Sequence, residues 1–511
     1  MAAMADTDEF KPLTGVTLLL AGAILAFTNF MVVLDTTIAN VSVAHISGSL
    51  GISSSQGTWV ITSYAVAEAI CVPLTGWLAG RFGAVRTFTL GIIGFGIFSV
   101  LCGMSTSLTM LVVCRIGQGF CGGPLMPLSQ TLMLRIFPKK QHGQAMGLWA
   151  MTTVIAPIVG PILGGAISDN MSWHWIFYIN IPVAALCAYG AHMLLRQAET
   201  RTEKMGIDRI GLALLVIWIG AFQVMLDLGR EHDWFEDGFI VSLAITAAVG
   251  LLVFIAWEVT ERQPIVDLRV FRHRGFTVSV ISLSFAFACF FASAVLIPQW
   301  LQSSMGYTAT DAGYVTAFTG VGAVIMSPIV AKLGEKVDPR GLVFFGIVWM
   351  GFGSYLRVYW SSGSDFWALS IPQIVQGIGL PFFFIPLTTI GLGAVDPEET
   401  ASAAGVMSFL RTMAGAIGTS VSNTIYYNNA TVARSEIVSK LNSDSTSTML
   451  QGTGFSLAQV RGTIEQTVTP ESYALSINHV FLLTAIIFVA AASIIWLAPR
   501  PTRTVEAGAA H

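Results

Sequence analysis

Apolar stretches about 20 residues long recur along almost the whole chain, and most of the segments between them are short. A helix needs about 20 apolar residues to cross the hydrocarbon core of a bilayer. Fourteen stretches meet this requirement: 15–40, 57–79, 87–104, 108–132, 144–167, 174–195, 210–228, 238–257, 276–298, 312–333, 341–360, 367–390, 401–426 and 475–498. The sequence therefore predicts an all-α membrane protein, and the even number of spans places both chain ends on one side.

The composition excludes several other classes of protein. Hydrophobic residues make up 54% of the 511 residues and charged residues only 11%, whereas a soluble domain carries about 25% charged residues. The net charge of −3 offers no basic surface for a nucleic acid. The six cysteines lie in apolar stretches without Cys-x-x-Cys spacing, so we expect neither a metal nor another cofactor. No cleavage site follows the first apolar run, which we expect to remain as a helix.

The loops between the spans carry an uneven distribution of basic residues, and basic loops stay in the cytoplasm. Placing both termini in the cytoplasm puts there nineteen of the 26 basic residues: Lys11, Arg81, Arg86, Arg135, Lys139, Lys140, Arg196, Arg201, Lys204, Arg209, Arg262, Arg269, Arg272, Arg274, Lys332, Lys336, Arg340, Arg500 and Arg503. Those outside are Arg230, Arg434, Lys440 and Arg461. The inner loop 391–400 departs from the pattern, because it carries acids without a base. We expect both termini in the cytoplasm.

Two segments half a chain apart resemble each other. Arg115-Ile-Gly-Gln118-Gly, followed by Pro-Leu-Ser, is similar to Gln373-Ile-Val-Gln376-Gly, followed by Pro-Leu-Thr. Each lies on the fourth helix of a half with six helices if two helices are treated as an insertion. Repeated helix bundles around a central cavity are typical of transporters. We predict an N-terminal bundle (1–206), two inserted helices (207–260) and a C-terminal bundle (261–511).

The predicted outside segment 427–474 is the longest connection and is rich in Ser, Thr, Asn and Gln. Such a composition is typical of a solvated connector. The segment could also form a contact surface for an accessory protein, and the sequence leaves both interpretations open.

An acid and a base occur inside apolar spans at matching depth. Asp35 lies in Leu34-Asp-Thr36-Thr-Ile-Ala-Asn40-Val, and Arg115 lies on the fourth span. At 1.5 Å per residue both lie about 9–10 Å below the outer surface, provided the first helix continues to about residue 41. A charged residue within a membrane is costly and usually functional, so we expect the two to pair. Alternatively, the first helix ends sooner and Asp35 is solvated.

Two further motifs are rich in glycine. Between the second and third spans stands Gly76-x-x-x-Gly80-Arg81-x-Gly83-x-x-Arg86, whose glycines permit a tight turn. The fifth span contains a kinking, closely packing motif in which proline removes a backbone hydrogen bond and glycine bares the helix face. Its residues are Pro157, Gly160, Pro161, Gly164 and Gly165.

Together these motifs resemble those of the major facilitator superfamily, and within it the fourteen-helix drug/proton antiporters of the EmrB type, from about Leu13 to Trp496. The Asp35 segment is similar to the family's L-D-x-T-[IV]-x-N-V-A-x-P, and the Arg115 segment to its proton-coupling motif. The fifth span resembles the motif typical of exporters. The Gly76 loop resembles the cytoplasmic loop that locks the inner face, although Gly80 replaces its acid and Ala84 a base.

The resemblance implies a major facilitator fold of two six-helix bundles plus two inserted helices, and proton-coupled export of hydrophobic or amphipathic drugs across the bacterial inner membrane. It implies proton coupling by Asp35 and Arg115 and a cytoplasmic gate at Gly76, Arg81, Gly83 and Arg86. Candidate cavity residues are Thr36, Asn40, Gln118, Gln376 and Arg411. The expected partners are lipophilic substrates, protons, membrane lipid, a periplasmic adaptor and an outer-membrane channel.

Glu68 stands near the middle of the second span, where a carboxylate should face a cavity rather than lipid. It could carry protons, attract cationic substrates, or be a protonated acid bonded to a neighbouring helix. An alternative function is proton-coupled uptake of a polar solute, which would call for more polar groups in the cavity. We do not expect an enzyme, because the eight His are scattered and none pairs with an acid at helical spacing within a span.

Overall fold

The structure, a computed structural model, describes residues 12–138, 141–202, 206–334, 336–440 and 457–499. Every regular element in these residues is a helix. The α-helices are α1 (Gly15–Leu50), α2 (Ser54–Cys71), α3 (Thr75–Phe82), α4 (Ala84–Gly103), α5 (Leu108–Gly122), α6 (Leu125–Ile136), α7 (His142–Asn170), α8 (Trp175–Tyr178), α9 (Asn180–Leu194), α10 (Arg209–Leu228), α11 (Gly238–Thr260), α12 (Arg274–Ser304), α13 (Ala309–Gly334), α14 (Pro339–Leu356), α15 (Phe366–Gly393), α16 (Thr400–Lys440) and α18 (Leu457–Ile494).

Short 3₁₀ turns lie at the ends of several helices or between them. They are η1 (Val72–Leu74), η3 (Arg196–Ala198), η4 (Trp234–Glu236), η5 (Leu268–Arg272), η6 (Arg357–Tyr359), η7 (Pro397–Glu399) and η8 (Ile495–Leu497). Two predicted spans each comprise two helices. The second is α2 and α3, joined by η1 with its Pro73, and the fourth is α5 and α6, joined at Gly123 and Pro124. Proline accounts for both interruptions, because it has no backbone N–H to donate.

Within the described residues, thirteen segments are long and apolar enough to span a membrane. The remaining predicted span, 401–426, lies in α16, which is also long but less apolar. Its composition fits its position, since α16 packs against α12, α18, α6, α3 and α10 and so presents little surface to lipid. The prediction of an all-α membrane protein with fourteen spans is thus confirmed in its fold class. The charged chain ends used to orient it lie outside the described residues.

The helices pack as two groups and a separate pair. In the first group α1 packs on α7 and α9, and α5 packs on α2 and α4. In the second group α15 packs on α13 and α14, and α12 packs on α16 and α18. Helices α10 and α11 pack mainly on each other, and α10 also contacts α2 and α16. This grouping agrees with two six-helix halves and an inserted pair, whose exact boundaries remain a prediction.

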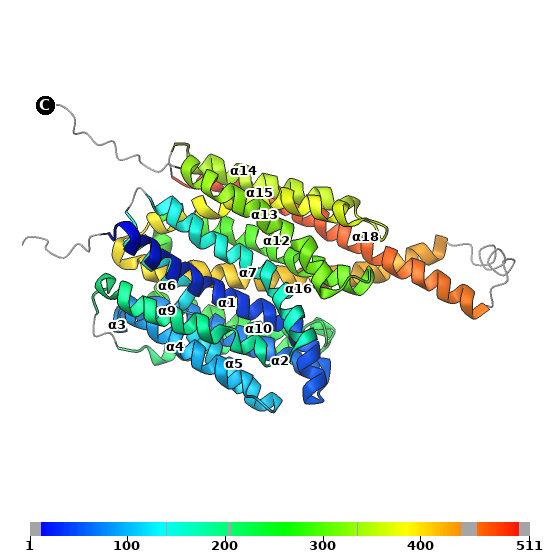
Figure 1. The fold of residues 1–511 in the computed structure, drawn as a ribbon, viewed down its shortest axis with the longest axis horizontal. Helices are drawn as coiled ribbons and strands as arrows, with labels where there is room; N and C mark the ends of the chain where they lie inside the picture. Colours follow the sequence, from blue (N-terminus) through cyan, green and yellow to red (C-terminus); the bar gives the residue numbers. More distant parts are fainter. Residues whose placement is uncertain (1–11, 139–140, 203–205, 335, 441–456, 500–511) are drawn as a thin grey trace, which may run out of the picture.

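The segment 427–474, predicted as a loop, is helical over all its described residues. Helix α16 has 41 residues and α18 has 38, about twice what a membrane crossing requires. Both extend beyond the other helices at one end of the molecule (Figure 1). We call residues 427–440 and 457–474 the hairpin, that end the hairpin end, and the opposite end, where α1 begins, the terminal end. The hydropathy pattern did not predict the helical structure of the hairpin, because the parts of α16 and α18 that extend beyond the bundle are polar.

Candidate functional site

Asp35 and Arg115 form a buried ion pair. Arg115 Nη1 donates to Asp35 Oδ2 at 2.6 Å, and each side chain is only 1% exposed. Helix α1 continues to Leu50, so Asp35 lies well inside it and the alternative of an early helix end is wrong. The expected pairing of these two residues is therefore present in the structure.

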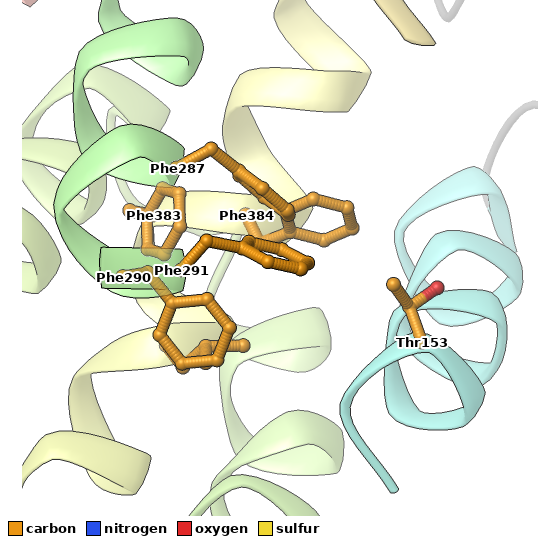
Figure 2. A pocket seen from close by; sticks show the side chains of 7 residues that line it. Thr153, Phe287, Phe290, Phe291, Phe383 and Phe384 are labelled. Carbon is orange, nitrogen blue, oxygen red and sulfur yellow. The ribbon is translucent and has the colours of Figure 1, made fainter. Parts of the chain in front are cut away.

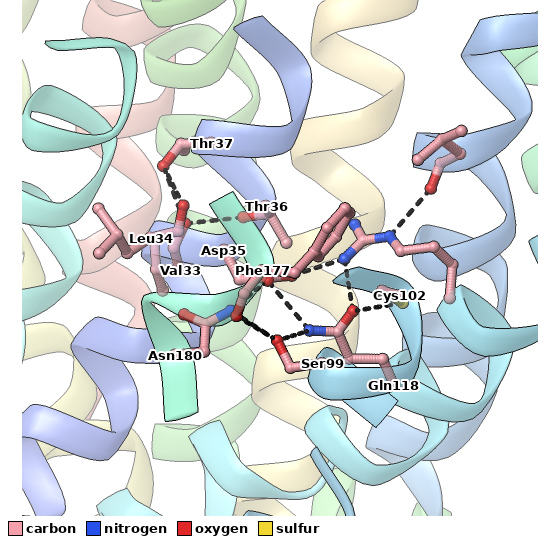
Figure 3. A network of polar contacts seen from close by, with 12 residues as sticks. Val33, Leu34, Asp35, Thr36, Thr37, Ser99, Cys102, Gln118, Phe177 and Asn180 are labelled. Atoms are coloured by element: carbon pink, nitrogen blue, oxygen red, sulfur yellow. Dashed lines mark hydrogen bonds and ion pairs between the residues drawn. The ribbon is translucent and has the colours of Figure 1, made fainter. Parts of the chain in front are cut away.

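Side chains from α4, α5 and α9 complete the network around Asp35 of α1 (Figure 3). Asp35 Oδ1 accepts hydrogen bonds from Gln118 Nε2 at 3.0 Å and from Asn180 Nδ2 at 2.6 Å. Both amides also donate to Ser99 Oγ. Neither Ser99 nor Asn180 was among the predicted site residues, because small polar residues are common in spans. Every contact to the carboxylate is a donor, so the network as drawn suits the ionised acid.

The guanidinium of Arg115 is held on its other sides as well. Its Nη1 also donates to Gln118 Oε1 at 2.8 Å, and its Nε donates to the carbonyl oxygen of Val60 at 3.1 Å. The ring of Tyr64 lies 4.2 Å from Cζ, within range of a cation–π interaction. The ion pair therefore connects α1, α2, α5 and α9, and loss of its charge would affect all four helices.

The glycines of the fifth span lie directly against α1 next to this network. A Cβ added at Gly160 would lie 2.6 Å from Thr37 Cβ, and one at Gly164 would lie 3.2 Å from the carbonyl oxygen of Ile38. Helix α7 can approach α1 this closely only because these positions lack side chains. Pro157 and Pro161 lie within the same helix.

Helix α7 also contacts the second half along its length. Near the terminal end, a Cβ on Gly147 would lie 3.5 Å from the side chain of Ile385 and 3.7 Å from that of Ala331. Toward the hairpin end, a Cβ on Gly313 of α13 would lie 2.9 Å from Ile162. One helix thus touches both the segment that carries Asp35 and the opposite half.

Residues Gly76 to Arg81 of the predicted gate loop lie in helix α3, which joins the halves at the terminal end together with the η1 turn before it. A Cβ on Gly76 would lie 2.8 Å from the backbone of Ser402 on α16, and one on Gly405 would lie 3.1 Å from the carbonyl oxygen of Val72. Arg81 and Arg86 are exposed. Gly83 has φ +92°, a conformation that favours glycine.

An acid that the sequence did not indicate lies at the start of α4. Glu199, after α9, accepts hydrogen bonds from the backbone N–H groups of Val85 at 2.9 Å and Arg86 at 3.0 Å. These are first-turn donors of α4, where a carboxylate is favoured by the helix dipole. A Cβ on Gly83 would lie 2.5 Å from the Glu199 carboxylate, so glycine also makes room for it.

The acids of loop 391–400 have no base in their own segment. They pair with basic residues of the segment just before α12. Arg272 Nη2 lies 3.0 Å from Asp396 Oδ2 and 2.8 Å from Glu399 Oε1. His273 Nε2 lies 3.0 Å from Glu399 Oε2. The positive charge of the segment before α12 therefore compensates the negative charge of the segment before α16.

An aromatic cluster lies between the halves. We define it as Trp149, Phe287, Phe290, Phe291, Phe383 and Phe384. Figure 2 shows the phenylalanines of α12 and α15 around a small pocket, with Thr153 of α7 facing them from the other half. The rings of Trp149 and Phe384 stack across the interface at 5.7 Å. Such a wall suits apolar and aromatic ligands.

Arg411 of α16 is buried against this cluster. Its Cζ lies 5.5 Å from the Trp149 ring, 5.3 Å from Phe287 and 5.9 Å from Phe384, and its Nη2 contacts the sulfur of Met126. Of the predicted cavity residues, Arg411 is thus the one located at the interface of the halves.

Glu68 lies half-buried on α2. Its carboxylate interacts electrostatically with Arg115 and with Arg411, which belong to opposite halves. The expectation that Glu68 faces inward agrees with this position.

The other predicted cavity residues lie elsewhere. Gln118 belongs to the Asp35 network, and Gln376 is buried beside Arg357 in the second half. Thr36 donates to the carbonyl oxygen of Val33 within its own helix, and Asn40 is exposed. These four do not form one cavity wall in this conformation, because the sequence pattern gave their depth but not the direction in which they point.

Comparison with known proteins agrees with this architecture. Residues 25–419 match the family model of the Major Facilitator Superfamily. The chain is 44% identical over 500 residues to the multidrug export protein EmrB of Escherichia coli K12, covering 97% of this chain and 98% of that protein. It is 42% identical to the fatty acid resistance protein FarB of Neisseria gonorrhoeae, covering 96% and 98%.

Solved structures show the same fold at low sequence identity. A bacterial homolog of the human lysosomal transporter Spinster superposes with a TM-score of 0.54 and 14% identity, covering 95% of this chain and 98% of that one. The human organic anion transporter MFSD10 gives 0.55 and 12%, covering 92% and 99%. The chain is a multi-pass membrane transporter rather than an enzyme, and it belongs to the major facilitator superfamily and, within it, to the family of EmrB multidrug export proteins.

Proposed function

We propose that this protein exports hydrophobic or amphipathic compounds across the bacterial inner membrane in exchange for protons. The observation that carries the proposal is the buried ion pair between Asp35 and Arg115, whose sequence segments resemble the family's proton-coupling motifs. The relatives named as multidrug export and fatty acid resistance proteins support lipophilic substrates. The aromatic cluster offers a surface for them.

The proposed coupling follows from the chemistry of the pair. Protonation of Asp35 removes its negative charge, so Arg115 loses its partner and the donors from Gln118 and Asn180 lose an anionic acceptor. The free energies of the alternative conformations then change by different amounts, which shifts their populations. Helix α7 transmits the change, because it contacts α1 at Gly160 and Gly164 and the other half at α13.

Proton movement coupled to substrate movement tests this proposal. Purified protein would be reconstituted into liposomes that contain a pH-sensitive dye, with a pH gradient imposed and a small panel of lipophilic compounds added. Antiport predicts that protons and substrate move in opposite directions across the membrane. Movement in the same direction would support symport instead, and substrate movement without proton flux would refute coupling.

Replacing Glu68 by glutamine is expected to reduce export of cationic compounds more than export of neutral ones. The carboxylate attracts a cation by several kcal/mol at an effective dielectric near 20, and its loss leaves Arg411 without the opposing charge. We expect the ratio of cationic to neutral transport to fall by at least about tenfold, because each 1.4 kcal/mol corresponds to a factor of about ten. Initial rates for matched cationic and neutral dyes in proteoliposomes would measure this ratio.

The exposed Glu236 on η4 provides the control for Glu68. Glu236→Gln removes the same charge outside the bundle and should leave the ratio unchanged. If Glu68→Gln slows neutral and cationic compounds equally, then Glu68 has a structural or proton-carrying role and does not select substrates.

We further propose that the protein works with a periplasmic adaptor and an outer-membrane channel, with the hairpin as its contact surface. With the termini in the cytoplasm, as the basic loops predict, the hairpin projects into the periplasm. It is held together by the Arg434–Glu465 ion pair at 2.7 Å and by the ring contact of Tyr427 with Tyr473 at 6.2 Å. Transport across one membrane does not require such a projection, which favours a role in assembly.

Deleting residues 436–465 and joining the ends with a short glycine-serine linker is expected to preserve transport in proteoliposomes and to lower drug resistance of whole cells. The ends can be joined because Arg434 and Glu465 are in contact. Resistance at the wild-type level, with the shortened protein present in the membrane at normal amounts, would show that the hairpin is not needed for assembly.

A further inference from the structure

The second half contains a buried arginine without an acidic partner. Arg357, the first residue of η6 directly after α14, is fully buried. Its Nη2 donates to Gln373 Oε1 at 2.6 Å and also to Gln376 Oε1. The carboxylates of the described residues form no ion pair with it. The rings of Trp360 and Phe481 lie 5.8 Å and 5.7 Å from Cζ, which offsets only part of the cost of burying the charge.

Four N–H-bearing atoms around this arginine lack an acceptor among the described residues. They are Arg357 Nε and Nη1, Gln373 Nε2 and Gln376 Nε2. The orientation of the Gln373 amide is fixed, because its Oε1 accepts from both Arg357 and Thr319, the latter at 3.0 Å. Rotating the amide would place its NH₂ group against the Arg357 guanidinium, which can only donate. The unpaired Nε2 therefore cannot be removed by exchanging the amide atoms.

The internal repeat allows the cluster around Arg357 to be compared with the Asp35 network of the first half. Gln373 and Gln376 are the eighth and eleventh residues of α15, as Arg115 and Gln118 are of α5. Arg357 stands 19 residues before Gln376, just as Ser99 stands 19 residues before Gln118. The second half thus carries its arginine at the place of Ser99.

The acid of the first half has no equivalent in the second. Helix α12, which opens the second half as α1 opens the first, contains no Asp or Glu between Arg274 and Ser304. In the first half Asp35 accepts hydrogen bonds from Arg115, Gln118 and Asn180. The second half keeps a cationic, donor-rich network and lacks its anionic acceptor.

We propose that Arg357, Gln373 and Gln376 bind a small inorganic anion of the chloride class. A buried positive charge with several unpaired N–H groups calls for an acceptor that is also negatively charged. A water molecule would accept only some of these bonds and would leave the charge uncompensated. The bound anion stabilises the packing of α13, η6 and α15, which supply Thr319, Arg357 and the two glutamines.

Thermal unfolding of the purified protein tests the site, with chloride as the probe. The protein would be prepared in sodium gluconate and titrated with sodium chloride at constant sodium concentration. Ligand binding to the folded state raises the unfolding temperature, and we expect a rise on the order of 2 °C per tenfold increase in chloride above half-saturation. An unfolding temperature independent of chloride would mean that water alone solvates the cluster, and would overturn the proposal.

Two variants and a control locate the effect. Arg357→Gln removes the charge and should abolish the chloride response. Gln373→Glu supplies a fixed carboxylate next to Arg357 and should make the protein stable without chloride and insensitive to it. Arg434→Gln removes an exposed arginine and should keep the full response. If Arg357→Gln does not fold, Gln373→Glu alone tests the location of the site. A chloride response retained in that variant would show that the anion binds elsewhere.

Discussion

Replacing Asp35 by asparagine is expected to abolish efflux driven by a pH gradient and to leave substrate exchange without a gradient in place. Asparagine keeps the volume and an oxygen that can accept hydrogen bonds from Gln118 and Asn180, so the helices can still pack. Asparagine does not bind or release a proton, so the proton gradient no longer changes the electrostatic interaction with Arg115. Transport would be measured in proteoliposomes with an imposed gradient and, separately, as counterflow.

Loss of one partner from a buried pair typically costs about 3–5 kcal/mol of stability, so Asp35→Asn also needs a stability control. The double variant Asp35→Asn with Arg115→Gln removes both charges and should recover the unfolding temperature without recovering gradient-driven efflux. Asp311→Asn, at an exposed acid near the start of α13, should behave as wild type. Normal gradient-driven efflux by Asp35→Asn would exclude Asp35 as the coupling acid.

Replacing Gly160 by leucine is expected to stop both gradient-driven efflux and counterflow. The added side chain would overlap Thr37, where a Cβ alone already comes within 2.6 Å of Thr37 Cβ, so α7 must move away from α1. Overpacking of this kind typically costs about 1–3 kcal/mol, which should appear as a lower unfolding temperature. Both transport assays and thermal unfolding of the purified variant would measure these effects.

Gly220 of α10 is the matched control for Gly160. A Cβ at Gly220 meets no atom within 4 Å, so Gly220→Leu should insert, fold and transport normally. The transport rate and unfolding temperature of Gly160→Ala should lie between those of Gly160→Leu and Gly220→Leu. If Gly160→Leu transports at the wild-type rate, close contact between α7 and α1 is not required for the cycle.

The sequence was sufficient to predict the spans, the two halves and the ion pair. Asp35 and Arg115 were identified because a charge inside an apolar span is costly and requires a partner, so each of them indicated the other. Their common depth followed from the helical rise. The contact between Gly160 and α1 follows the same logic, since glycine in a membrane helix usually marks a close approach.

Other parts of the site could not be predicted because their residue types are common in membrane helices. Ser99 and Asn180 differ from other small polar residues only in their position beside Asp35. The stacking of Trp149 on Phe384 was equally hidden, because aromatic side chains also face lipid. Arg357 lies so near the predicted end of its span that it did not stand out, although it is fully buried.

The hairpin and Glu199 were missed for a different reason. Hydropathy detects helices that lie in lipid, whereas 427–440 and 457–474 are helices outside the predicted membrane region. Glu199 accepts hydrogen bonds from α4, more than a hundred residues earlier in the chain. The sequence around an isolated acid after a span does not indicate which helix it will contact. Both depend on tertiary packing that local sequence does not encode.

Helix α16 passes from the contact with Gly76 at the terminal end, past Arg411, to the hairpin as a single uninterrupted helix of 41 residues. At 1.5 Å per residue it is a rod about 60 Å long. A tilt of about 5° at its base would displace its far tip by about 5 Å by the geometry of such a rod. If α16 tilts when the opposite face opens, a protein bound to its tip would be displaced by that distance, which would couple the two sides of the membrane mechanically.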